Sequence, residues 1–191
     1  MMPVPPAIET NQGRTMVLEA YADTILPGEK RWPGDRAVAG VSSDGGAVAA
    51  GALLALRSPE GGLAPALDAL ADGLDEHAEE YAAETGIELD PEVPAFVSLD
   101  FPDRVRLVQR LTDPTHPERE AWISLAMFSV IAFDAAAHSH TVEALDAGHV
   151  GLKIIGFRQP DSDGLWRFDT YSYGRQLAQP HPDTTASGSP A

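Results

Sequence analysis

Apolar residues recur along the first third of the chain at intervals of three and four, which places them on one face of a helix. This spacing predicts a helix over 15–26, which a Pro-Gly pair ends. Residues 28–43 are rich in Gly and Pro and predict a loop. A second helix of small residues is predicted over 45–57, with Asp44 as its N-cap.

The next predicted helix starts near Pro65 and ends at Gly86, a favourable residue just past a helix end. Its apolar face holds Leu63, Leu67, Leu70, Leu74, Ala78 and Tyr81. Its other faces carry Asp68, Asp72, Asp75, Glu76, Glu79, Glu80 and Glu84. This acidic run predicts a solvated helix face, and attraction of a basic partner or of cations is the alternative.

Two capping motifs predict the helices of the second half. Asp100 with Asp103 resembles a cap for a helix through Thr112. The run Thr115-His116-Pro117-Glu118 predicts the start of a helix from Pro117 to about His138.

Residues 121–133 of that helix are apolar except for two serines, so the helix is predicted to lie at the centre of a bundle. We therefore expect four of its side chains to be inaccessible and Trp122 to be largely so. The four are Ala126, Met127, Val130 and Phe133.

After a short helix over 141–147, residues 149–178 lose helical periodicity and hold five of the 13 aromatic residues. They predict an extended aromatic arm laid over the bundle. The fold class is therefore all-α: five to six helices around a buried central helix, with an aromatic non-helical C-terminal arm. We expect one domain over 14–178, with disordered segments at 1–13 and 179–191.

The net charge of −16 is concentrated in one quarter of the chain: residues 58–103 contain 13 acidic residues and no basic one. Because the basic residues do not form a cluster, we expect neither nucleic acid nor an anionic membrane surface as a partner. The absence of cysteine excludes disulfides, thiolate metal sites and cysteine nucleophiles.

The first residues lack the basic and apolar regions of a signal peptide, so a cytoplasmic location is expected. The longest apolar run, 13 residues, is shorter than the roughly 20 that a membrane-spanning helix needs. Glycine-rich phosphate loops and the GxSxG nucleophile motif are also missing, so FAD and ATP are not expected to bind directly by those devices.

One candidate catalytic site stands at the end of the long apolar helix. Asp134 and His138 are four residues apart, which places them on one helix face, and His140 follows. An Asp–His pair can act as a general base, and all three residues together could hold a metal. The alternative is structural: a histidine in a last helical turn interacts well with the helix dipole, and a buried aspartate can be its hydrogen-bond partner. No metal is the expectation we favour.

The aromatic arm supplies a candidate binding set for a partner or ligand. Aromatic side chains interleaved with arginine are typical of interfaces and ligand clefts. The residues are Trp166, Phe168, Tyr171, Tyr173 and Arg175. An arm whose aromatics only close the core fits the pattern equally well, and both interpretations stay open.

Three segments resemble a known family. The string YADTILPG (21–28), a following Pro-Gly and AVAGV (37–41) are similar to the opening of the small third subunit of gluconate dehydrogenases. The string GFRQPDSDGLWRFDTYSYGRQLA (156–178) resembles an uncharacterised actinobacterial branch of that group, often found in biosynthetic gene clusters.

The resemblance implies a helical accessory subunit of a flavin-dependent oxidoreductase of the glucose–methanol–choline type, with FAD in the partner subunit and a role in secondary metabolism. The alternative is a small stand-alone enzyme of natural-product biosynthesis that uses Asp134, His138 and His140 on a small-molecule substrate. Whether the chain is itself an enzyme stays open at this point.

Overall fold

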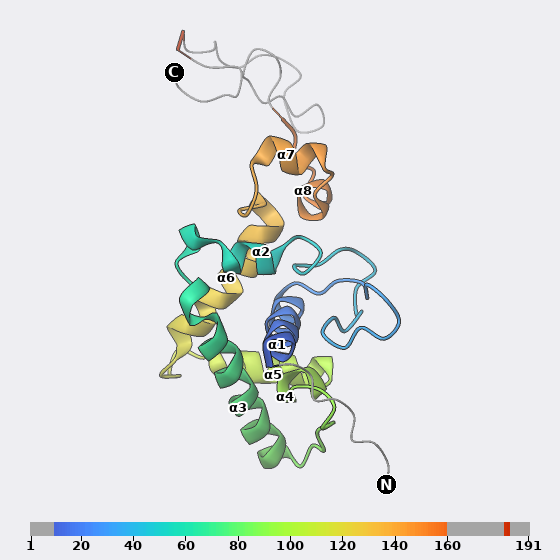
Figure 1. Ribbon diagram of the computed structural model, residues 1–191, viewed down its shortest axis with the longest axis vertical. Helices are drawn as coiled ribbons and strands as arrows, with labels where there is room; N and C mark the ends of the chain where they lie inside the picture. Colours follow the sequence, from blue (N-terminus) through green and yellow to red (C-terminus); the bar gives the residue numbers. More distant parts are fainter. Residues whose placement is uncertain (1–9, 160–181, 184–191) are drawn as a thin grey trace.

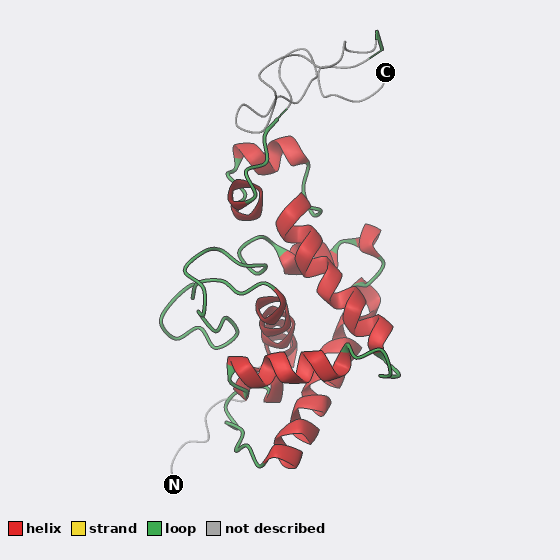
Figure 2. Ribbon diagram, turned by 180° about the vertical axis from the view of Figure 1, so that it is seen from behind, coloured by secondary structure: helices red, strands yellow, loops and turns green. Residues whose placement is uncertain are grey.

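The computed structural model describes residues 10–159 and 182–183, and it contains helices but no strand in that part of the chain (Figures 1 and 2). The α-helices are α1 (Thr10–Ile25), α2 (Ala52–Arg57), α3 (Leu67–Thr85), α4 (Ala95–Ser98), α5 (Phe101–Leu111), α6 (Arg119–Ala135), α7 (Thr141–Asp146) and α8 (Val150–Ile154). Two 3₁₀ turns, η1 (Pro59–Gly61) and η2 (Ala64–Ala66), lie between α2 and α3. The predicted all-α fold is confirmed.

The central helix of the bundle is α1, not the long apolar helix that the sequence predicted. Helix α1 packs against α2, α3, α4, α5 and α6 (Figure 1). Its Tyr21 is fully buried and donates a hydrogen bond to the carbonyl oxygen of Trp122, 2.7 Å away. This bond ties α1 to α6 through the core. Helix α1 also begins at Thr10, so residues 10–13 form its first turn.

Helix α6 packs along one side of the bundle, and this corrects the prediction that it is buried all round. Its buried stripe consists of Trp122, Leu125, Ser129 and Ala132. Met127 and Val130 are exposed, while Ala126 and Phe133 are half-buried. Apolar composition is not sufficient for burial, because a helix at the edge of a bundle has neighbours on one side only.

Both predicted ends of α6 also differ from the structure. Thr115 does not cap the helix: the Glu118 amide, which such a cap would accept, donates to His116 Nδ1, and the helix begins only at Arg119. The Thr115 amide and hydroxyl both donate to Asp113 Oδ1. At the other end, Ala136 adopts a left-handed conformation with φ 49° and ends the helix before His138.

Helix α2 is shorter than the predicted 45–57 helix because two glycines place the chain in a turn first. Gly46 lies against the backbone of 26–28, where a Cβ would collide with the Leu26 carbonyl. Gly51 has φ 87°, which favours glycine, and α2 starts only after it. Asp44 is therefore not a helix cap; its carbonyl oxygen accepts the Glu29 amide instead.

Buried polar groups fix the Gly- and Pro-rich loop 28–43 onto the bundle. Asp23 accepts the amides of Gly28 and Ala39 at 3.0 and 2.8 Å. Buried Arg104 donates to four backbone carbonyls, those of Arg36, Ala37, Val97 and Leu99. Burial lowers the pKa of Arg104 to about 10 despite the opposing charge of Asp23. The guanidinium thus joins this loop to α4 and α5.

Helices α3 and α5 agree with their predicted caps and faces. Asp100 accepts the Asp103 amide at 2.9 Å, and Gly86 ends α3 with φ 74°. On α3, the predicted apolar face is buried at Leu67, Leu74, Ala78 and Tyr81 and half-buried at Leu70. Leu63, also predicted on this face, is half-buried but precedes the helix. Of the helices in the described part, none is both long and apolar enough to cross a bilayer.

The first residues of the predicted non-helical arm are helical. The His149 ring accepts the Leu152 amide and so caps α8. Leu152 is buried with Ala136 and Ala144 in a small apolar cluster. A cap and one buried leucine therefore suffice for a helical turn that periodicity could not reveal.

Candidate functional site

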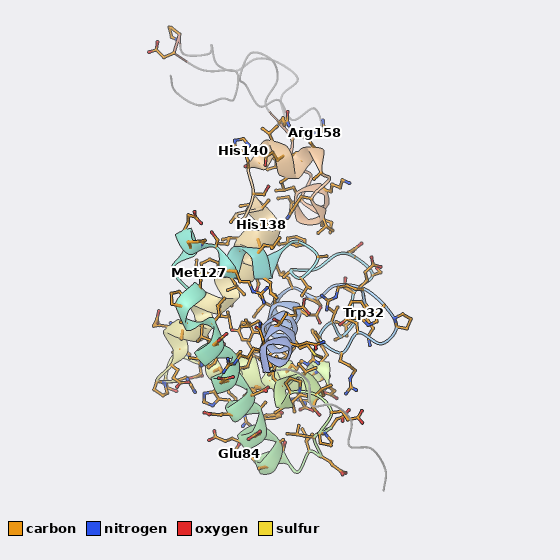
Figure 3. All side chains as sticks on the ribbon, in the orientation of Figure 1. Trp32, Glu84, Met127, His138, His140 and Arg158 are labelled. Atoms are coloured by element: carbon orange, nitrogen blue, oxygen red, sulfur yellow. The ribbon has the colours of Figure 1, made fainter. Side chains whose placement is uncertain are left out.

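The structure does not bring the predicted trio of Asp134, His138 and His140 together. Asp134 is exposed on the last turn of α6. His140 is exposed and caps α7 by accepting the Val142 amide at Nδ1. Figure 3 shows His138 near the end of α6 and His140 beside α7. Because the left-handed Ala136 breaks the helix, Asp134 and His138 do not share a helix face.

His138, which follows the end of α6, instead packs against Gly51 and His149. A Cβ added to Gly51 would be 2.5 Å from its ring, so the ring sits against this glycine. The ring centroids of His138 and His149 are 5.8 Å apart. Burial, with a smaller contribution from the charge of His149, lowers the pKa of His138.

His149 is held to the bundle by its own hydrogen bond. Its Nε2 lies 2.9 Å from the Ala50 carbonyl oxygen. Its Nδ1 accepts the Leu152 amide, so Nε2 carries the ring proton and is the donor. The two histidines therefore act here as packing and anchoring groups for α8.

The aromatic binding set lies outside the described residues. Trp166, Phe168, Tyr171, Tyr173 and Arg175 all fall within 160–181. Their predicted role in binding a partner or ligand stays a prediction.

The outer face of α6 is an apolar stripe on the surface. Met127 is 57% exposed and Val130 is 40% exposed, and Ile123 and Ile131 beside them are half-buried. No charged residue lies between Glu120 and Asp134 in the sequence. Figure 3 places Met127 on the opposite side of the view from exposed Trp32.

A second feature, which the sequence did not predict, is a cluster of His77, His116 and Glu118. One ligand-capable atom from each residue lies within 4.8 Å of the other two. Among the described residues, no other group of three histidine or acidic side chains meets this distance condition. His77 comes from α3, and the other two come from the turn before α6.

Hydrogen bonds organise this cluster around the Glu118 carboxylate. His77 Nε2 lies 2.8 Å from Glu118 Oε2, and Trp122 Nε1 donates to the same oxygen at 3.3 Å. The Glu118 amide donates to His116 Nδ1 at 3.2 Å. The His77 hydrogen bond, more than any other contact, lowers the pKa of Glu118.

A hollow of about 390 Å³ adjoins the cluster between α3 and the start of α6. Glu118 and Trp122 belong to both the cluster and the wall of the hollow. The rest of the wall is mostly small and apolar: Ala66, Ala69, Leu70, Gly73, Pro117 and Ala121, with Glu120. This arrangement places a polar cluster at the edge of an apolar concavity, which is a common form of ligand site.

Sequence reasoning missed the cluster because its members are remote along the chain. His77 and Glu118 are separated by 41 positions. In the sequence, His77 belongs to the predicted acidic helix, and the run that contains His116 and Glu118 has the pattern of a helix cap. Only the packing of α3 beside the start of α6 joins them.

Comparison with known proteins identifies a family whose function is unknown. Residues 12–191 match the family described as "Family of unknown function (DUF5987)". Neither the curated proteins nor the solved structures contain a match to this chain.

Proposed function

The chain belongs to the DUF5987 family of unknown function, and we propose that it is an accessory subunit that binds a second protein through the outer face of α6. The observation that carries the proposal is the exposure of Met127 and Val130 in α6, where residues 121–133 include no charged side chain. Exposed apolar stripes are typical of surfaces that a partner covers.

The proposed partner is a flavin-dependent oxidoreductase of the glucose–methanol–choline type. The support for this class is the resemblance of YADTILPG and the C-terminal string to small subunits of such enzymes. FAD would be bound by the partner, and this chain would stabilise the catalytic subunit. A role in secondary metabolism belongs to the same proposal.

Charge favours a different protein over a second copy of this chain. The stripe ends at Glu120 and Asp134, and the chain carries a net charge of −16. Two copies would bring like charges together, whereas a partner with an apolar patch and a basic rim would complement them. The proposed interface is therefore heteromeric.

The test is co-expression with a flavin-dependent oxidoreductase of the glucose–methanol–choline type from the same organism, chosen first from the genes that neighbour this one. Size-exclusion chromatography should show both proteins in one peak that absorbs as flavin. The double variant Met127→Glu with Val130→Glu should abolish co-elution, because it buries two charges in the contact. Val41→Glu is the matched control, since Val41 is 55% exposed on a loop, and it should leave the complex intact.

Three results would contradict the proposal. They are separate elution of the wild-type proteins, equal loss of the complex in Val41→Glu, and a homodimer that the double variant dissociates. The last result would assign the stripe to self-association.

A further inference from the structure

We propose that His77, His116 and Glu118 bind a divalent transition metal, with zinc as the ion. This inference is independent of the proposed docking face, which lies farther along the chain, on α6 itself. It rests on the convergence of three ligand-type side chains from two separate segments.

The chemistry of the three donors matches zinc. Two imidazoles and one carboxylate form a set that zinc accepts in three-ligand protein sites. Calcium and magnesium prefer oxygen donors, and the cluster supplies a single carboxylate. The donors therefore select a transition metal over the common hard cations.

Only small movements of the three side chains are needed to bring their donor atoms to the separations found around a zinc ion. Zinc ligands about 2.1 Å from the ion are about 3.4 Å from one another in a tetrahedron. His77 Nε2 and Glu118 Oε2, 2.8 Å apart, already lie within that separation. His116 is held beside them by the Glu118 amide, and its ring centroid is 5.6 Å from that of His77. All three donors lie within 4.8 Å of each other, so rotation of side chains can close the set.

One outer group, Trp122, already forms a hydrogen bond with a donor, and a second, Glu80, lies near the outer nitrogen of His77. Glu80 Oε2 lies 3.7 Å from His77 Nδ1, on the side of the ring away from Glu118. A carboxylate behind a ligating histidine orients the ring and raises its basicity. Trp122, which is 2% exposed, holds the Glu118 carboxylate from the core side. A simple surface ion pair between His77 and Glu118 would need neither His116 nor these outer groups.

Three protein donors leave a coordination position for water or an external ligand. Glu118 lines the adjoining hollow of about 390 Å³. A small ligand with an apolar body could therefore approach the metal from that side.

The experiment is isothermal titration of the full-length, chelator-treated protein with Zn²⁺. We expect one equivalent to bind and the melting temperature to rise with zinc, because the ion binds the folded chain. His77→Ala and His116→Ala should each weaken binding by at least about 100-fold, and Glu80→Gln by about tenfold. Mg²⁺ and Ca²⁺ should produce no thermal shift.

His140→Asn is the matched control, since it removes an exposed histidine elsewhere and keeps a residue that caps helices well. It should leave zinc affinity unchanged. Circular dichroism of each metal-free variant separates loss of a ligand from loss of the fold. The proposal is overturned if folded His77→Ala and His116→Ala bind zinc as the wild type does. It is also overturned if His140→Asn weakens binding equally, or if the wild type takes up no stoichiometric zinc.

Discussion

At the scale of single residues, the buried carboxylate of Asp23 fixes the loop that follows α1. It is 1% exposed and accepts two backbone amides, one from the turn after α1 and one from the far end of the following loop. Burial raises its pKa, although the two amides and the Arg104 charge oppose that shift. The YADTILPG string is therefore at least partly a structural motif, because its aspartate fixes the loop that follows it.

Replacing Asp23 by Ala should destabilise the fold by about 2–4 kcal/mol, because a buried N–H group and a half-buried one would lose their acceptor. Thr24→Val is the neighbouring control. Its hydroxyl donates to the Ala20 carbonyl, and its loss should cost less than about 1 kcal/mol. Urea unfolding of the three proteins measures the difference. Equal destabilisation by both changes would show that Asp23 has no special role.

At the scale of elements, α6 shows that a hydrophobic pattern can predict a helix, whereas packing decides which face of that helix is buried. The sequence predicted a helix there correctly, because its length and apolar content leave few alternatives. It could not predict which face is buried, since an apolar residue occurs on every side. The structure buries Ser129 and exposes Met127, the reverse of their polarity.

The stability lost when a side chain of α6 is replaced by alanine should therefore depend on the helix face and not on the size of the side chain. Leu125→Ala, at a position 1% exposed, should cost about 3 kcal/mol of unfolding free energy. Met127→Ala removes a side chain of similar volume from the surface and should cost about 0.5 kcal/mol. Chemical denaturation of the isolated chain is the measurement. A large cost for Met127→Ala in the absence of any partner would mean that the outer face is covered within the monomer.

Caps and end signals were predictable where they act between neighbours in sequence, and not where tertiary contacts intervene. Asp100 and Gly86 perform the predicted roles at the ends of α5 and α3. Thr115 does not, because the amide that it would accept, that of Glu118, donates to His116 instead. The same limit applies to the sites. A spacing of four along one helix suggested Asp134 with His138, whereas the cluster that converges joins α3 to a turn 41 positions away.

At the scale of the whole molecule, the apolar interior is divided unequally. The main cluster joins α1, α3, α4, α5 and α6, and a second, of alanines, lies between α1, α2 and α6. The third holds only Ala136, Ala144 and Leu152 and attaches α7 and α8 (Figure 1). Because opening free energy follows buried apolar contact, α7 and α8 should open before the rest of the bundle.

The attachment of α8 should also weaken in acid, through His138. The pKa of this histidine is lowered from 6.5 by burial and then by the charge of His149. The unfolded chain therefore binds the proton more readily, so the contribution to stability is complete above pH 6.5. This contribution to stability is lost as the pH falls through the lowered pKa of His138. Lowering the pH across this window should increase the opening of α7 and α8 amides relative to those of α1.

Hydrogen exchange, corrected for the intrinsic rate at each pH, tests this expectation. His138→Phe keeps a ring against Gly51 and removes one titrating group, so the pH dependence of opening should become weaker. His140→Asn leaves His138 in place and should retain it. If opening of α7 and α8 is independent of pH in the wild type, or remains equally dependent in His138→Phe, protonation of His138 does not control this end of the molecule. A response that extends equally to α1 would instead indicate a global effect of acid on the acidic bundle.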